Sequence, residues 1–148
     1  MLKEVLTRLI GTTIVATGRA IKTHNLKLYD KNNFEITPEQ YVVLNTLNEE
    51  GSLYQKEIGD KLYKDKANIT RLLSILEEKG LVEKNSQIEN EKQVNKVKIT
   101  ENGIDVRDKI SPAVDAARRE YVQDISEDDL YTCIKVLEKI QENISRKL

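Results

Sequence analysis

Side chains suited to recognising nucleic acid gather in the middle of this chain. Asn68, Thr70 and Arg71 share the polar face of a segment whose opposite face is apolar. Amide and guanidinium groups bond base edges in the major groove of DNA, and cations neutralise phosphates. Between Lys61 and Arg71 there are four cations and one anion, a local charge of +3, although the whole chain carries a net charge of −1. Because phosphate attraction depends on local patches, this region is predicted to contact double-stranded DNA.

The predicted contact residues come from this polar face, from the segment before it and from a lysine-bearing stretch further on. They are Gln55, Lys56, Lys64, Lys66, Ala67, Asn68, Thr70, Arg71, Ser74, Lys92 and Lys96. Arg71 is expected to contact a phosphate or a guanine, whereas Lys92 and Lys96 are expected to contact phosphates without sequence preference.

Residues that support catalysis or metal binding are scarce. The chain has one cysteine, Cys133, so an internal disulfide and a cysteine-rich metal site are excluded, and a reducing cytoplasm fits. Cys133 is expected to be a small buried hydrophobe. His24, the one histidine, is expected at a helix end on the surface, although it could line an effector pocket. With no glycine-rich phosphate loop and no metal-ligand cluster in the sequence, neither an enzyme nor a cofactor is indicated.

The polar face must be positioned by local structure, and the sequence predicts a helix-turn-helix there. Ser52 and Gln55 match a capping box at the start of a short helix over residues 55–62. Residues 63–65 form the turn, and Asp65 is the predicted N-cap of the next helix.

This second helix is predicted over residues 66–79, with Gly80 as its left-handed stop. Its apolar residues are spaced three and four apart and so share one stripe: Ile69, Leu72, Leu73 and Leu76. After it, residues 81–84 and 94–99 are strand candidates, and the polar stretch 85–92 is predicted to be an exposed loop. The order of helix, turn, helix and ribbon is that of a winged helix-turn-helix, which places a helix in the major groove.

The first part of the chain is predicted to be helical. Apolar residues recur at helical spacing over residues 2–24, and residues 26–33 are expected to be a connection. Thr37, followed by a proline, begins a helix that is expected to end at Gly51. No run approaches the length of a membrane span, and charges inside the first apolar stretch argue against a cleaved signal.

The last part is predicted to hold two more helices. Thr100 caps a helix to about residue 123 that Pro112 should kink, and Ser126 caps the final one. The final helix carries one apolar stripe: Leu130, Cys133, Ile134, Leu137, Ile140 and Ile144. One small winged domain cannot cover this stripe and that of the first helix, so pairing with a second copy is predicted.

Several of these segments together resemble the MarR family of bacterial regulators. The matching runs are ITPEQY at 36–41, EIGDKL at 57–62, ITRL at 69–72, LEEKGLV at 76–82 and VKIT at 97–100. The resemblance implies a mostly α protein with a small β-wing, a winged helix-turn-helix whose terminal helices form a dimerisation region. Over residues 1–148 it implies one domain, with DNA binding in 37–100 and dimerisation in 1–25 and 101–148.

The wing departs from the family pattern, because no arginine occurs between Arg71 and Arg107, and lysine is not equivalent in a narrow minor groove. Tyr63 and Lys64 also stand in a turn where the family often has glycine.

The resemblance further implies a cytoplasmic regulator, a repressor that binds a near-palindromic operator as a homodimer and is released by a small aromatic ligand. The residues expected to line that ligand's pocket are Ile14, Arg19, Tyr41 and Leu44. They could equally be packed core. The alternative function is a protein-interaction module without sequence-specific DNA binding, which the neutral net charge and the arginine-free wing favour.

Overall fold

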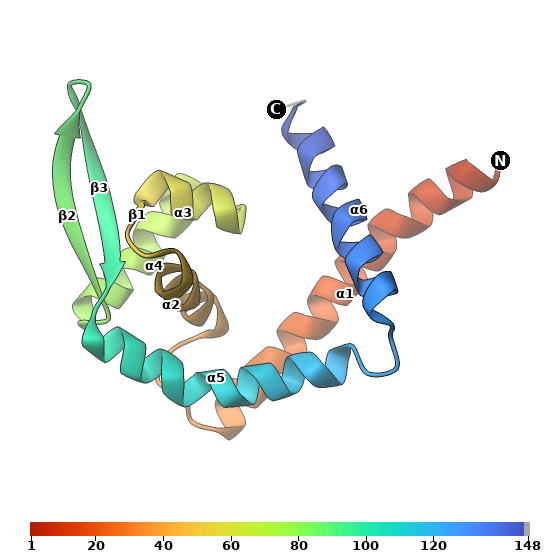
Figure 1. Ribbon diagram of the computed structural model, residues 1–148, viewed down its shortest axis with the longest axis horizontal. Helices are drawn as coiled ribbons and strands as arrows, with labels where there is room; N and C mark the ends of the chain where they lie inside the picture. The colour runs from red at the N-terminus through yellow and green to blue at the C-terminus, as the bar shows by residue number, and fades with distance from the viewer. Residues whose placement is uncertain (147–148) are drawn as a thin grey trace. The chain divides into compact units, whose positions relative to one another are not determined.

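A computed structural model describes residues 1–146 and builds them from helices and one small antiparallel sheet (Figure 1). The elements are, in order, α1 (Leu2–Lys31), α2 (Pro38–Glu50), β1 (Leu53–Tyr54), α3 (Gln55–Leu62), α4 (Lys66–Glu78), β2 (Val82–Glu89), β3 (Lys92–Ile99), α5 (Glu101–Tyr121) and α6 (Glu127–Ser145). The chain divides into two compact units, residues 1–110 and residue 111 onward. The predicted fold class is confirmed.

Most predicted helix ends are confirmed by their hydrogen bonds. Thr37 and Gln40 form the reciprocal capping box at the start of α2, with a proline at the first helical position. The Asp65 carboxylate accepts the Asn68 backbone N–H at 2.8 Å and so caps α4. Gly80 adopts a φ of 73°, which a residue with a side chain rarely takes, and ends that helix.

The core of the first unit lies where the apolar stripe of α4 meets α2, α3 and the base of the sheet. The four stripe residues of α4 are each 2% exposed or less. The largest fully buried partners around them are Tyr41, Val43, Leu44, Leu47, Ile58 and Val97. This packing fixes α4 so that its opposite, polar face points to solvent.

The sheet has the strand order β1-β3-β2, with both pairs antiparallel. Val82 pairs with Ile99 at the base, and Glu89 pairs with Lys92 next to the turn. Beyond the base, β2 and β3 form a ribbon that projects away from the helices of this unit (Figure 1).

The wing corrects one prediction, because the stretch predicted as an exposed loop over residues 85–92 is mostly strand. It is exposed as expected, but β2 continues to Glu89 and turns through Asn90 and Glu91, both with positive φ. A ribbon with solvent on both faces needs no apolar alternation, so its strands carry no periodic signal.

Two further predictions about element ends are wrong. Residues 26–33 were expected to connect two helices, yet α1 runs on to Lys31 because Tyr29 is buried and packs edge-on against Phe34, with ring centroids 5.2 Å apart. Ser52 does not cap α3. Instead Tyr54 is the N-cap residue, and its backbone N–H donates to the Glu57 carboxylate at 2.9 Å.

The last two helices begin as predicted. The Thr100 hydroxyl accepts the Gly103 backbone N–H at 3.0 Å, and the Ser126 hydroxyl accepts that of Asp129 at 3.1 Å. The helix α5 continues through Pro112 and ends at Tyr121. None of the helices that the structure describes is long and apolar enough to cross a bilayer.

The helix α6 has no buried residue within the single chain. Ile134, in its predicted stripe, is 53% exposed. Cys133 is exposed as well, which corrects the expectation of a buried thiol, while Leu130, Leu137 and Ile140 of the same stripe are half-buried. His24 is exposed as predicted, but it lies within α1 and not at a helix end.

Candidate nucleic-acid interface

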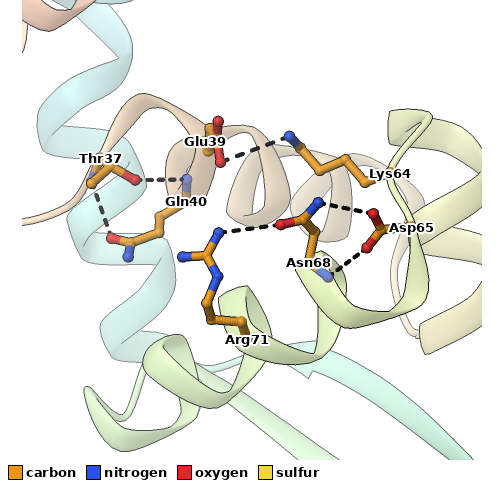
Figure 2. A network of polar contacts seen from close by, with 7 residues as sticks. All are labelled: Thr37, Glu39, Gln40, Lys64, Asp65, Asn68 and Arg71. Carbon is orange, nitrogen blue, oxygen red and sulfur yellow. Dashed lines mark hydrogen bonds and ion pairs between the residues drawn. The ribbon is translucent and has the colours of Figure 1, made fainter.

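The exposed face of α4 carries the side chains that the sequence singled out for base contacts. Lys66, Ala67, Asn68, Thr70, Arg71 and Ser74 are all exposed, while the stripe on the other side of the helix is buried. Figure 2 shows that three residues in this region form one chain of contacts from the N-cap along the helix. Asn68 donates to Asp65 through its amide nitrogen at 3.2 Å and accepts from Arg71 at 3.4 Å.

A groove of about 780 Å³ lies between this region and the wing. Four lysines line it, one each from α3, the turn, the start of α4 and the wing: Lys56, Lys64, Lys66 and Lys92. Its floor includes Gly59 and Ile69. Two acids, Asp60 and Asp65, also line the groove, so its lining is positive on balance, which suits a phosphate backbone.

Not all cations of this region are equally available. Lys61 pairs with Glu50 at 3.4 Å, and Lys64 pairs with Glu39 at 3.7 Å, so α2 offsets part of the local charge counted from the sequence. Among the residues that the structure describes, Lys56, Lys66 and Lys92 form no ion pair. Because exposed ion pairs contribute little, Lys64 can exchange its partner for a phosphate at small cost.

Gln55 and Thr70 were predicted to contact DNA directly, but the structure joins them to each other. The Gln55 amide nitrogen donates to the Thr70 hydroxyl at 2.8 Å, and the Gln55 amide oxygen accepts from Asn95 at 3.4 Å. Lys96 lies half-buried over the ring of Tyr54, with its ammonium 5.1 Å from the ring centroid. These residues therefore connect the helices to the wing.

Sequence reasoning missed Tyr54 and Glu89. The Tyr54 phenol donates a hydrogen bond to the Glu89 carboxylate at 2.6 Å, across 35 positions of sequence. This bond, with smaller contributions from desolvation and from the charges of Glu89 and Glu57, raises the pKa of Tyr54 above its ordinary value of 10.0. The weak signal that could have found the pair is Asn90, whose tolerance of positive φ marks the hairpin turn that places Glu89.

The four residues predicted to line an effector pocket differ in their exposure. Tyr41 and Leu44 are buried in the core, Ile14 is half-buried and Arg19 is exposed. A cavity of about 420 Å³ instead lies between α1 and the start of α2, and none of the four lines it. The burial of Tyr41 and Leu44 agrees with a packing role, and the effector pocket lined by the four residues stays a prediction.

Arg71 belongs to this cavity as well as to the polar face of α4. In Figure 2 its guanidinium extends from α4 toward Gln40 at the start of α2, where the Thr37–Gln40 capping bonds lie. The cavity lining combines apolar atoms with a few polar groups: Gly18, Ile21, Lys22, Asn25, Leu26, Thr37, Pro38, Glu39, Gln40, Val42, Arg71 and Leu72. Within residues 1–146 no group of three or more histidine, cysteine or acidic side chains could hold a metal ion.

The geometry defines a winged helix-turn-helix protein, and comparisons with known proteins agree. The sequence profile of the MarR family matches residues 36–94. The chain is 28% identical over 122 residues to the HTH-type transcriptional regulator MhqR of Bacillus subtilis, which covers 82% of each protein. A MarR/EmrR family transcriptional regulator from Acinetobacter sp. ADP1 has the same fold, with a TM-score of 0.81 at 19% identity over 95% of this chain and 98% of that one.

A third similar protein is NadR, whose structure was solved in complex with 4-hydroxyphenylacetate. It superposes with a TM-score of 0.74 at 20% identity, over 88% of this chain and 91% of NadR. Residues 36–94 therefore match the MarR family, and the relatives that the chain resembles along most of its length are transcriptional regulators and not enzymes.

Proposed function

We propose that this regulator binds a near-palindromic operator as a homodimer, acts as a repressor in the cytoplasm and is released by a small aromatic acid. The observation that carries the proposal is the contrast between two exposed helix faces. The exposed face of α4 is polar and cationic, whereas the exposed stripes of α1 and α6 are apolar. The first suits DNA and the second suits another protein surface.

The dimer follows from uncovered apolar surface at both ends of the chain. Among the residues of α1, Leu2, Leu6 and Leu9 are each more than half exposed, and the one buried residue of that helix is Tyr29. No residue of the helix α6 is fully buried. We therefore assign residues 1–25 and 101–148 to dimerisation and 37–100 to DNA binding. A two-fold dimer would place its recognition helices about 34–36 Å apart, one turn of DNA.

Two measurements test the assembly. Light scattering after size exclusion should give twice the chain mass of 17.0 kDa. Ile134→Lys, which places a charge in the exposed stripe of α6, should shift the protein toward monomer. Thr132→Lys adds the same charge on the opposite side of that helix and should leave the dimer intact. A monomeric wild-type protein would contradict the proposal.

DNA binding is tested by a salt-dependent gel shift on the region upstream of the regulator's own gene. A specific complex should weaken steeply as salt rises, since lysines of the groove release counterions from phosphates. If the protein binds no DNA but retains its fold, the protein-interaction alternative is the better explanation.

The cavity between α1 and α2 is the proposed effector site. Its apolar lining and the two cations Lys22 and Arg71 suit an aromatic ring that carries one carboxylate. A ligand of this class binds NadR, as the complex with 4-hydroxyphenylacetate shows for that protein. Because Arg71 lies on both the cavity and the DNA-facing helix, a carboxylate that draws it inward would remove a contact from the operator.

Salicylate and related acids should raise the melting temperature of the protein and weaken its operator complex. A 100-fold preference for the released state corresponds to about 2.7 kcal/mol of coupling. Lys22→Ala should keep operator affinity but lose the response to the acid, since Lys22 lines the cavity from α1 and not from the DNA-facing helix. If no acid alters melting or DNA binding, the effector part of the proposal is wrong.

A further inference from the structure

We propose that Tyr54 and Gln55, two consecutive residues at the start of α3, clasp the wing from its two faces and hold it in position for DNA binding. They are positioning residues and need not touch the DNA themselves. The inference rests on the proposed DNA binding, and it assigns a role to a cluster that joins the start of α3 to the wing.

The first half of this clasp is the Tyr54–Glu89 bond. Tyr54 pairs with Lys96 in the β1–β3 ladder, and the Lys96 ammonium lies over its ring. From there the side chain reaches along the wing, and its phenol O–H donates to Glu89 at 2.6 Å. Lys96 is opposite Asn85, so Glu89 is four residues further out, about 13 Å at the usual rise of a strand. One tyrosine therefore joins the base of the wing to its tip.

The second half is a series of hydrogen bonds between amide and hydroxyl side chains that begins at Gln55. Gln55 donates to Thr70 on α4 and accepts from Asn95 on β3. The Asn95 oxygen accepts the Ser86 hydroxyl at 2.9 Å, which crosses to β2. Gln93 donates to the same Ser86 oxygen at 3.3 Å. This series of hydrogen bonds therefore links α4 to both strands of the wing.

The two halves lie on opposite faces of the ribbon. Side chains alternate between faces along a strand, so Lys92 and Lys96 share one face and Gln93 and Asn95 share the other. Glu89 is the ladder partner of Lys92 and belongs to the first face. Contacts on both faces resist bending of the ribbon in either direction.

The wing needs such contacts because its own packing cannot fix it. A two-stranded ribbon is marginal in water, and within β2 and β3 the buried residues are Val82 and Val97, both at the base. The Tyr54–Glu89 hydrogen bond also holds the Glu89 carboxylate, which lies opposite Lys92 in the ladder. The negative charge of Glu89 is therefore turned toward the tyrosine and away from the expected position of the DNA phosphates.

Hydrogen exchange without DNA provides the direct test. Tyr54→Phe removes the phenol O–H but keeps the ring, and it should speed amide exchange over residues 85–95. Tyr131→Phe is the control, because Tyr131 lies outside the wing on α6 and, like Tyr54, lies under a lysine, Lys135 at 5.4 Å. Its exchange in the wing should equal that of the wild type. Unchanged wing exchange in Tyr54→Phe would overturn the proposal.

Operator affinity tests whether the clasp serves DNA binding. Tyr54→Phe should weaken the operator complex by about threefold to tenfold, the scale of one lost hydrogen bond. The dependence of affinity on salt should stay the same, because no phosphate contact is removed. A wild-type affinity together with faster wing exchange would overturn the role in DNA binding.

A second pair of variants separates the bond from its charge. Glu89→Ala and Glu91→Ala each remove one negative charge from the wing, but only Glu89 accepts from Tyr54. Glu89→Ala should speed wing exchange and Glu91→Ala should not. Glu89→Gln keeps an oxygen that can accept the phenol O–H and should restore slow exchange. Failure of the wild-type protein to bind DNA would instead overturn the proposed function, and it would leave the exchange results unaffected.

Discussion

The helices α4 and α6 have the same kind of apolar stripe but different surroundings. Both space their apolar residues three and four apart, and both begin with a side-chain cap. The stripe of α4 is buried by α2, α3 and the sheet, so that helix shows solvent a polar face. The stripe of α6 is only partly covered, since three of its six residues are half-buried and none is fully buried. A periodic pattern therefore predicts a helix and its apolar face, but not which chain covers that face.

The contrast separates two kinds of stability. The winged part is held by contacts within the chain, such as those of Leu73 and Ile58 in its core. The terminal helices leave apolar area whose burial requires a partner, and that contribution depends on protein concentration. The two surfaces that remain exposed differ accordingly, since one is cationic and the other apolar.

The largest expected effect comes from truncating equivalent positions of the two stripes. Leu73→Ala should lower the free energy of unfolding by about 2–5 kcal/mol, because the side chain is 0% exposed and leaves a cavity. Ile134→Ala should cost less, and its cost should vary with protein concentration. Denaturation of both variants at several concentrations measures this. An equal, concentration-independent loss in both would mean that α6 is covered within one chain.

The same contrast explains which features of the fold could be predicted from the sequence. The caps Thr37, Asp65 and Ser126 were predicted correctly, because each needs only a short polar side chain at a fixed offset from a helix. Which residues pack against an apolar stripe cannot be predicted in this way. Cys133 was expected to be buried on the basis of periodicity alone, and it is exposed. That error has a physical cause, since burial is a property of the neighbours.

A second prediction examines the polar face of α4. Arg71→Ala should weaken specific operator binding by about 1–3 kcal/mol if the guanidinium bonds a base in two places. Arg71→Lys should restore binding only if the contact is a phosphate, because an ammonium cannot make the paired bonds. Glu78→Ala, at an exposed position near the end of α4 that is not among the predicted contacts, is the control. Unchanged affinity in Arg71→Ala, with the fold intact by circular dichroism, would remove this residue from the interface.

The candidate site was predictable where one helix carried it and less so where distant segments meet. Asn68 and Arg71 were found because helical spacing places them together. The DNA contacts of Gln55 and Thr70 stay a prediction, but their mutual hydrogen bond was not foreseen, since it spans 15 positions and depends on how α3 packs on α4. Tyr54 and Glu89 were missed for the same reason, because their contact exists only once the hairpin has formed.

The smallest expected effect is that of a single lysine in the wing. Lys92 lines the groove, whereas Lys98 lies at the base of the wing and pairs with Glu83 at 3.4 Å. Lys92→Ala should weaken binding to all DNA sequences alike and lower the slope of log affinity against log salt by about one unit. Lys98→Ala removes the same charge away from the groove and should leave the slope unchanged. Binding isotherms at several salt concentrations, on operator and on unrelated DNA, distinguish the two. If Lys92→Ala changes which sequence is preferred, the wing reads the shape of the minor groove despite having no arginine, and the wing joins α4 as a determinant of specificity.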